Sequence, residues 1–339
     1  MSFLVNKSSL LMLKLAAAAA ILIVLAWQAQ SHEAFAELVA GQKQWQYLML
    51  GLLATIIGMV LSFVRWSVIA QAAGIGLSVL EAIRLGAVGF GLSFVGPGAI
   101  GGDLFKAVAI ARGREGQRAI AATTVFVDRF IGLFAWLLTA SMAILAFTIA
   151  GAAPGGVAWL VCQATLVATG VAIVLAAVLF IPQIANERLA ERLATLPRTG
   201  KMLSQLLQAW RHYQNRPSLL AISLILSLIA DAVMVVSFYC IALGLPFAAP
   251  SLIEHFFIVP INLISSALPL TPFGIGVREG VADLMYQGFG VPPGQGTLIA
   301  AGHTVTMIAT GGLAVLYYLV ERGAGSLMEV QTASPEPKS

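Results

Sequence analysis

The sequence has few charged residues, and almost none of them form long polar segments. Asp, Glu, Lys and Arg make up 10% of the 339 residues, and only the segment 183–217 has the composition of a soluble protein. Hydrophobic residues make up 59% of the chain, and the mean hydropathy is +0.91. A water-soluble fold of this size would leave far too much apolar surface exposed. The composition therefore predicts a membrane protein with the lipid bilayer as its solvent.

Other absences narrow the function. The two cysteines, Cys162 and Cys240, lie in separate apolar runs, which argues against a disulfide framework or a thiolate metal site and leaves both as packing residues. Gly200-Lys201 lacks the upstream glycine and the following Ser or Thr of an ATP-binding P-loop. The net charge of +4 is small and its basic residues cluster in loops, so no nucleic-acid partner is expected. No metal site and no cofactor are predicted.

Six apolar runs are long enough to cross a bilayer, which takes about 20 helical residues. They are Leu10–Trp27, Leu48–Ile69, Ala121–Ala150, Val157–Ile181, Leu219–Leu243 and Thr297–Val320. The first run has Lys7 and Lys14 at its start and small residues near Ala29, so a cleaved secretory signal is an alternative. Its length favours an uncleaved span.

Basic residues indicate the orientation of these spans. If Met1 is cytoplasmic, the outer loops hold almost only Lys43, and two inner loops hold Arg112, Arg114 and Arg118, and Arg188, Arg192, Arg198, Lys201, Arg211 and Arg216. This positive-inside pattern predicts a multi-pass protein of the bacterial inner membrane with both termini in the cytoplasm. Residues 1–325 are expected to form one membrane domain. Within it, the segment 183–217 has an apolar helical stripe that includes Trp210, and is predicted to lie along the inner membrane surface. A disordered tail is expected over 326–339.

Two further apolar segments, Ala82–Ala111 and Phe256–Gly290, are interrupted near their middle. The predicted breaks are Gly96, Pro97, Gly98, Gly101 and Gly102 in the first segment, and Pro272, Gly274 and Gly276 in the second. Proline removes a helical hydrogen-bond donor and glycine allows turn conformations, so each segment is expected to enter the bilayer and return. Non-helical backbone at that depth survives only inside protein or beside a wet cavity. Two kinked spanning helices are the alternative.

The two interrupted segments also share a pattern. Pro97-x-x-Ile-Gly101 matches Pro272-x-x-Ile-Gly276, and Asp128 and His303 follow at the same offset. Three full crossings lie between the segments, so the halves, about 48–181 and 218–321, would be inverted relative to each other, as in many transporters. The predicted fold is therefore an all-α polytopic membrane protein with about six transmembrane helices and two re-entrant broken-helix hairpins. The short match leaves homology of the halves open.

Three ordered motifs carry a resemblance to a known family. They are GPGAIGGDLFK at 96–106, VDRFIGL at 127–133 and PFGIGVREG at 272–280. From about Leu48 to Val320 the chain resembles the flippase-like membrane domain of lysylphosphatidylglycerol synthases, also called multiple peptide resistance factors, and their stand-alone YbhN-like relatives. In the full synthases an aminoacyl transferase domain follows, and the resemblance implies that the membrane domain translocates the modified lipid. Little sequence follows Glu321 here, so lipid aminoacylation is not expected.

The resemblance implies a lipid transporter of the flippase or scramblase type and not an enzyme. Its lipid partner would be a phospholipid, a hopanoid or an isoprenoid-linked lipid, and an oligomer is compatible with the sequence. Two other classes stay open. One is a membrane-embedded enzyme that acts on a lipid-linked substrate, and the other is an ion or solute transporter.

Charged residues inside the apolar segments are the candidate site, because each costs about 2.5–3.5 kcal/mol on insertion scales unless it has a partner. Arg278 is predicted to bind a lipid phosphate, with Lys106 or Arg129 as a second contact. Helix N-termini just after Gly102 and Gly276 would point toward the same anion. The acids expected to balance the cations, or to bind a cationic headgroup, are Asp103, Asp128 and Glu279.

Asp128 and Arg129 are neighbours on a helix and are not expected to pair. His303 is a candidate proton relay, while Arg65 and Arg84 are interpreted as membrane-interface anchors. No catalytic residue is assigned. The alternative is that all these charges form structural ion pairs that hold the hairpins in place.

Overall fold

A computed structural model describes residues 34–95, 99–112, 118–151, 154–179, 213–266, 271 and 274–332, with a few single residues between 191 and 210. These residues form helices and no strands. The helices are α2 (Ala34–Ala40), α3 (Trp45–Ala72), α4 (Val79–Val95), α5 (Ala99–Ala111), α6 (Arg118–Ile149), α7 (Gly156–Leu179), α10 (Pro217–Gly244), α11 (Leu252–Ser265), α12 (Val277–Gly288) and α13 (Gln295–Thr332). The all-α fold predicted from the sequence is confirmed.

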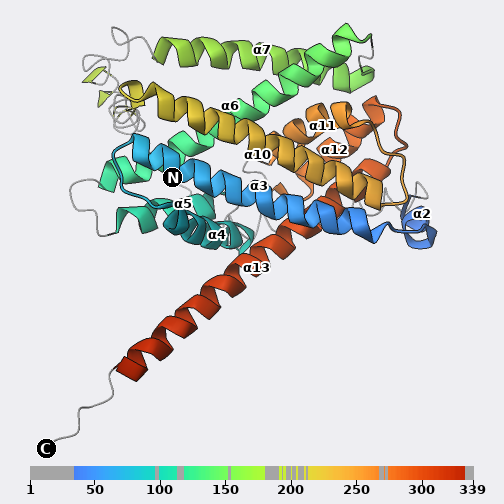
Figure 1. The fold of residues 1–339 in the computed structure, drawn as a ribbon. Helices are drawn as coiled ribbons and strands as arrows, with labels where there is room; N and C mark the ends of the chain where they lie inside the picture. The colour runs from blue at the N-terminus through green and yellow to red at the C-terminus, as the bar shows by residue number, and fades with distance from the viewer. Residues whose placement is uncertain are drawn as a thin grey trace, which may run out of the picture.

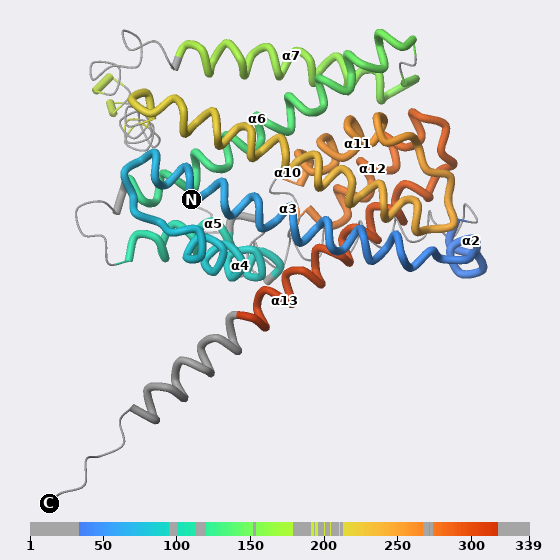
Figure 2. Tube along the Cα trace, in the orientation of Figure 1, coloured from blue at the N-terminus to red at the C-terminus, as the bar shows by residue number. Residues whose placement is uncertain are grey.

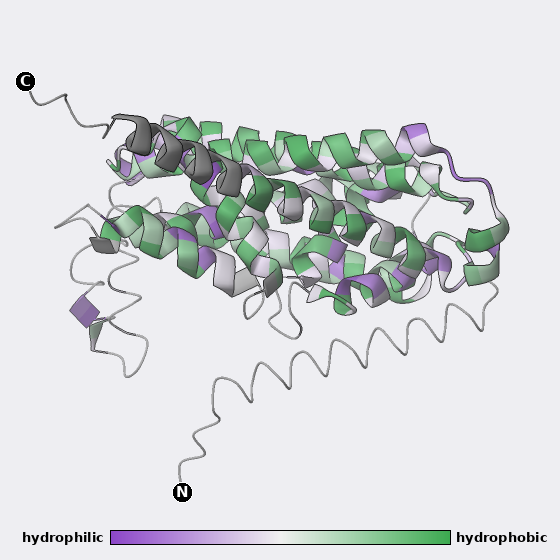
Figure 3. Cartoon of the chain, turned by 90° about the horizontal axis from the view of Figure 1, so that it is seen from below, coloured by the Kyte–Doolittle hydropathy of each residue, from purple (hydrophilic) through white to green (hydrophobic). Residues whose placement is uncertain are grey.

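Five of the described helices, α3, α6, α7, α10 and α13, are long and apolar enough to cross a membrane. They coincide with five of the six predicted spans, and the first predicted span, Leu10–Trp27, lies outside the described residues. Figure 3 shows that hydrophobic residues dominate these helices along their length. Many apolar side chains point outward, as in α7, where Val167 is 67% exposed. Such surfaces are stable only where lipid covers them.

Both interrupted segments form helical hairpins. In the first, α4 packs against α5, and in the second, α11 packs against α12. The first break is shorter than predicted, because α5 begins at Ala99 and already contains Gly101 and Gly102. The helix N-terminus expected just after Gly102 is therefore misplaced. Gly96, Pro97 and Gly98 in the first break, and Pro272 in the second, lie outside the described residues.

Glycine has a packing role in the first hairpin and a conformational role in the second. A Cβ atom on Gly102 would overlap the Gly89 carbonyl oxygen, so the absence of side chains lets the α4 and α5 backbones touch. Gly276 precedes α12 with φ of 87°, a left-handed conformation that other residues adopt at a cost. The N-cap Ser251 starts α11 with a capping box to Glu254. Sequence-local signals thus mark where α11 and α12 begin.

The centre of the molecule is an antiparallel pair of helices, α3 and α10 (Figure 1). At one end of the pair, the Arg216 guanidinium donates to the Gln71 carbonyl oxygen at 2.7 Å. Halfway along, the hydroxyls of Thr55 and Ser237 are 2.7 Å apart. At the other end, the backbone N–H of Gln44 donates to the carbonyl of Gly244 at 3.0 Å. The helices that precede the two hairpins therefore run in opposite directions.

The remaining contacts between helices occur in pairs, one in each half of the chain. The first hairpin packs through α4 on α13, and the second packs through α11 on α6. Each hairpin also contacts the span that follows it, α5 against α6 and α12 against α13. Figure 2 shows the hairpins near opposite ends of the α3–α10 pair. This is the arrangement that inverted halves predict.

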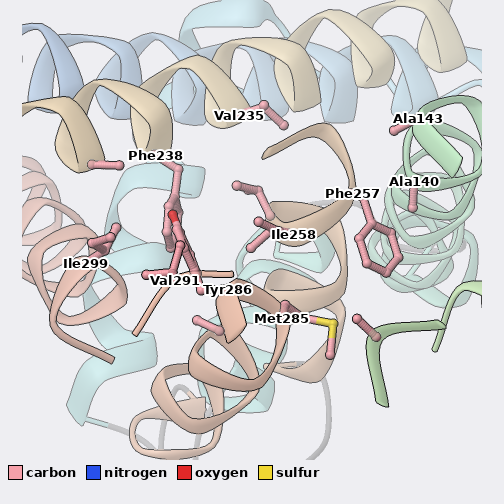
Figure 4. Close-up of a cluster of buried hydrophobic side chains, with 14 of the residues drawn as sticks. Ala140, Ala143, Val235, Phe238, Phe257, Ile258, Met285, Tyr286, Val291 and Ile299 are labelled. Atoms are coloured by element: carbon pink, nitrogen blue, oxygen red, sulfur yellow. The ribbon is translucent and has the colours of Figure 1, made fainter. Parts of the chain in front are cut away.

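Buried apolar side chains form a core around the second hairpin, shown in Figure 4. Phe257, Ile258, Met285 and Tyr286 pack there against α6, α10 and α13. A second cluster surrounds Trp66 between α3 and α6.

Two described residues at the end of the segment 183–217, Trp210 and Tyr213, are buried in the cluster around Trp66. Their rings pack on protein beside the start of α10. The last helix, α13, continues to Thr332. That 183–217 lies along the membrane and that 326–339 is a disordered tail stay predictions. Most of 183–217 and residues 333–339 lie outside the described residues.

Candidate functional site

A polar cavity of about 210 Å³ lies where the two hairpins meet the central helices. Its walls come from α3, α4, α5, α6, α10, α11, α12 and α13. The charged residues that line it are Arg65, Asp103, Lys106, Asp128, Arg129, Asp231 and Arg278. Five of the six predicted substrate-binding residues therefore converge on one cavity, although they come from three separate parts of the sequence. The exception is Glu279.

Asp128 on α6 is a buried acid of this cavity. Its Oδ1 accepts a hydrogen bond from Arg65 Nε at 2.9 Å, and its Oδ2 lies 3.6 Å from Lys106 Nζ. The side chains of all three are at most 9% exposed. Lys106 Nζ also lies 4.6 Å from the centre of the Trp66 ring, a cation–π contact. One carboxylate thus contacts two buried cations.

The prediction that Arg65 is an interface anchor is wrong, because Arg65 lines the cavity. It lies near the end of the apolar run 48–69, which made a position at the membrane surface seem natural. The helix continues to Ala72, however, and α6 and α10 pack against the guanidinium, which also donates to Ser227 Oγ at 3.2 Å. Asp231 on α10 also lines the cavity, and Thr139 Oγ1 donates to its carboxylate at 3.5 Å.

Asp103 and Arg129 form a two-pronged ion pair between α5 and α6. Arg129 Nε donates to one carboxylate oxygen at 2.6 Å and Nη2 donates to the other at 3.0 Å. The Arg129 side chain is 53% exposed, unlike the other cavity cations. Asp103 also lies 3.9 Å from Lys106 Nζ. As predicted from helix geometry, Arg129 pairs across helices and not with its neighbour Asp128.

Arg278 and Glu279 lie at the start of α12, where both are 2% exposed. Arg278 Nη2 donates to the Thr304 hydroxyl at 2.7 Å, and that hydroxyl contacts Glu279 Oε1 at 2.5 Å. Glu279 turns back to accept the backbone N–H of Gly276 at 2.6 Å. Glu279 does not line the cavity because it caps its own helix. Of this pair, only Arg278 faces the cavity.

The shared pattern of the hairpins extends to these contacts. Adding 175 to each residue number takes Pro97 to Pro272 and Asp128 to His303. The same shift takes the pair Asp103 and Arg129 to Arg278 and Thr304, which also contact each other. Equivalent positions therefore join the hairpin to the next span in both halves. In one half the contact is ionic and half-exposed, and in the other it is buried.

Two other polar residues have partners that explain their burial. Asp283 accepts hydrogen bonds from the backbone N–H groups of Gly294 and Thr297, at 2.9 and 3.1 Å, and so caps the start of α13. His255 Nε2 lies 2.8 Å from the Tyr286 hydroxyl. His303 is different. The centre of its ring lies 4.7 Å from the centre of the Phe238 ring, and its Nε2 has no hydrogen-bond partner among the described residues. Its role as a proton relay stays a prediction.

The described residues contain no group of three or more His, Cys, Asp or Glu side chains arranged to hold a metal ion. The cavity offers four cations, of which Lys106 and Arg278 are on the hairpins, and the other two are on α3 and α6. Guanidinium and ammonium groups are the usual ligands of phosphate oxygens. The site is chemically suited to an oxyanion.

The fold and the cavity together define a multi-pass α-helical membrane protein with a charged cavity between two helical hairpins. The family model for the lysylphosphatidylglycerol synthase TM region matches residues 11–314 of the sequence. The chain therefore belongs to this family. The match starts before the expected Leu48 and includes most of the first predicted span. Comparisons with curated proteins and with solved structures gave no match.

Proposed function

We propose that this protein moves the phosphate-bearing headgroup of a membrane lipid from one leaflet to the other through the charged cavity. The observation that carries the proposal is the convergence of Lys106 and Arg278, one from each hairpin, and of Arg129 from α6 on one cavity inside a largely apolar helix bundle. Membership of the family supports a lipid-related role in the membrane. Charges at this depth are costly and usually mark a transport pathway.

The ion pairs of the cavity favour an exchange mechanism. Each cation has an acid or a hydroxyl of the protein as its partner. A lipid phosphate would replace these contacts with paired hydrogen bonds, which keeps the number of unpaired charges low throughout. Of the candidate cargoes, phospholipids and isoprenoid-linked lipids carry phosphate, whereas hopanoids lack it. The cavity therefore favours a phosphate-bearing lipid.

The chain direction supports a two-sided pathway in the bacterial inner membrane. The first hairpin starts and ends beside the C-terminal end of α3, where Arg216 also lies, and the second starts and ends at the other end of the α3–α10 pair. With the basic loops in the cytoplasm, the first hairpin enters from the cytoplasmic side and the second from the outside. A headgroup between the hairpin ends would then be reachable from either leaflet in turn. Both termini are cytoplasmic in this proposal.

A vesicle assay tests transport directly. Purified protein is reconstituted with a trace of fluorescent phospholipid, and dithionite then bleaches every probe that reaches the outer leaflet. Wild type should expose inner-leaflet probe, and Arg278→Ala should not, because the truncation removes a cavity cation. Arg278→Lys keeps the charge but loses the paired donors, so an intermediate rate is expected.

The control is Lys43→Gln, since Lys43 does not line the cavity and donates to the Val39 carbonyl. This variant should move lipid at the wild-type rate. Correct folding of each variant is checked by its elution from a size-exclusion column in detergent. If wild type exposes no probe from any of a panel of phospholipids and isoprenoid-linked lipids, passive translocation of those lipids is refuted.

A further inference from the structure

A large apolar groove lies beside the charged cavity on the outside of the first hairpin. It has a volume of about 800 Å³, within the usual range of about 300–1,000 Å³ for ligand pockets. Its floor is formed by apolar residues of α5 and α6, namely Leu104, Ala107, Val108, Ala111, Ala122, Val125 and Phe126. Asp103 and Arg129 close one end, and Arg112 marks the other. Asp103 and Arg129 also line the cavity, so their ion pair separates the two spaces.

The dimensions of the groove match one membrane leaflet. From Asp103 to Arg112 there are nine helical steps, or about 14 Å at 1.5 Å per residue. This is close to half of the roughly 30 Å hydrocarbon core. Arg129 lies eleven residues after the start of α6, about 17 Å along that helix, and therefore near the middle of the bilayer. The groove thus leads from the membrane surface to the level of the cavity.

The exposure of Arg129 indicates what the groove binds. A guanidinium that is half-exposed at this depth needs an anion or water on its open side. Only Nε and Nη2 donate to Asp103, which leaves Nη1 without a bonded side chain among the described residues. Lipid is the surrounding solvent, and its anionic group is the phosphate.

The equivalent surface of the second half is closed. Ala107, Ala111 and Val125 line the groove, and adding 175 gives Ala282, Tyr286 and Ala300. Ala282 and Tyr286 are 0% exposed, whereas Ala107 and Ala111 are half-buried, and Val125 and Ala300 are buried alike at 3% and 2%. The two halves therefore differ on the side of α5, where the first half is open and the second is closed.

We propose that the groove is a lateral binding site for a glycerophospholipid, with an acyl chain along α5 and α6 and the phosphate on Arg129. The Asp103–Arg129 ion pair is the gate between this site and the cavity. An arriving phosphate takes the place of the Asp103 carboxylate on Arg129, and Asp103 keeps a cation because Lys106 Nζ is already 3.9 Å away. The headgroup then passes into the cavity while the acyl chain stays in the lipid. This inference rests on the proposed translocation.

The groove is tested by filling it. Val108→Trp places a bulky ring on its floor, where Val108 is 48% exposed, and leaves every charged residue unchanged. The matched control is Val167→Trp on α7, where the native side chain is also lipid-exposed but lies outside the groove. In the dithionite assay Val108→Trp should slow phospholipid exposure at least tenfold, and the control should match wild type. If Val108→Trp and wild type expose phospholipid at equal rates, the proposal that the groove binds lipid is overturned. The proposed function survives that result if Arg278→Ala is still inactive.

A lipid probe shows what occupies the groove. In a variant with Cys162→Ala and Cys240→Ala, a bimane label on Val108→Cys should be quenched by phospholipids brominated on the acyl chain. A label on Val167→Cys reports the quenching by bulk lipid. A bound acyl chain is supported if the label at 108 is strongly quenched and its quenching saturates at a lower fraction of brominated lipid than that of the label at 167. Absence of quenching at 108 means that protein, such as the chain's own segment 10–27 or a second copy, covers the groove, and overturns the proposal.

The gate is tested by selectivity and not by rate alone. Two fluorescent lipids with the same tails are compared, a phospholipid and a glycosylceramide without phosphate. Arg129→Gln should lower the ratio of phospholipid to glycosylceramide rates at least fivefold, because only phosphate uses the guanidinium. If both rates fall by the same factor, Arg129 has only a structural role and the gate is refuted.

Discussion

The cost of removing the Asp128 charge measures how strongly the cavity depends on its ion pairs. Asp128→Asn preserves the shape of the side chain but leaves Arg65 and Lys106 without the carboxylate that they share. Breaking one side of a buried ion pair costs about 3–5 kcal/mol. Here the lower end applies, because Lys106 keeps Asp103 at 3.9 Å and Arg65 keeps the Ser227 hydroxyl at 3.2 Å. We therefore expect a loss of about 3 kcal/mol in the free energy of unfolding.

The assay is reversible unfolding in mixed micelles with increasing SDS, followed by tryptophan fluorescence. A double-variant cycle with Arg65→Gln separates the pair from the single changes, and the coupling energy should be about 1–3 kcal/mol. Lys43→Gln serves as a control and should stay within about 0.5 kcal/mol of wild type. A loss below about 1 kcal/mol for Asp128→Asn would show that water enters the cavity and solvates the cations, and would refute the reasoning.

Three further changes have defined outcomes. Gly102→Val should destabilise the first hairpin by about 1–3 kcal/mol through its clash with the Gly89 backbone, measured in the same SDS titration, and Gly102→Ala should cost less. Asp283→Ala removes the acceptor of two N–H groups at the start of α13 and should cost about 0.5–2 kcal/mol, with no change in lipid selectivity. Tyr286→Phe leaves the His255 ring without its hydroxyl partner and should cost about 1–3 kcal/mol, whereas Phe289→Leu, which loses no hydrogen bond, should cost less than about 1.5 kcal/mol.

Hydropathy predicted the spans well because lipid requires apolar side chains on every outward face, whatever the interior contains. The runs Leu48–Ile69 and Leu219–Leu243 are α3 and α10 with a few residues added at each end. The breaks were also visible, since glycine and proline act locally on the backbone. The sequence could not place Gly101 and Gly102 inside α5, because close packing against α4 outweighs the low helix propensity of glycine.

The candidate site was predictable as a set of charges but not as a set of pairs. Asp103, Lys106 and Asp128 were chosen because charges in apolar segments need partners, and that argument requires no knowledge of the fold. Which cation meets which acid depends on how α3 and the first hairpin pack, and so Arg65 was assigned to the interface. A local signal was available for Glu279, which stands three residues after Gly276 in the position of a capping acid.

The unequal hairpin contacts have a thermodynamic consequence for any cargo. If both halves were identical, the states open to either side would have equal free energy and the unloaded protein would spend equal time in each. The half-exposed ionic contact of Asp103 and the buried contact of Arg278 break that equality, so in the proposed transport cycle the two states would differ in free energy. Such a difference would change how fast lipid is taken up from each leaflet. By itself it would not accumulate lipid on one side, because asymmetry without an energy source leaves the equilibrium distribution unchanged.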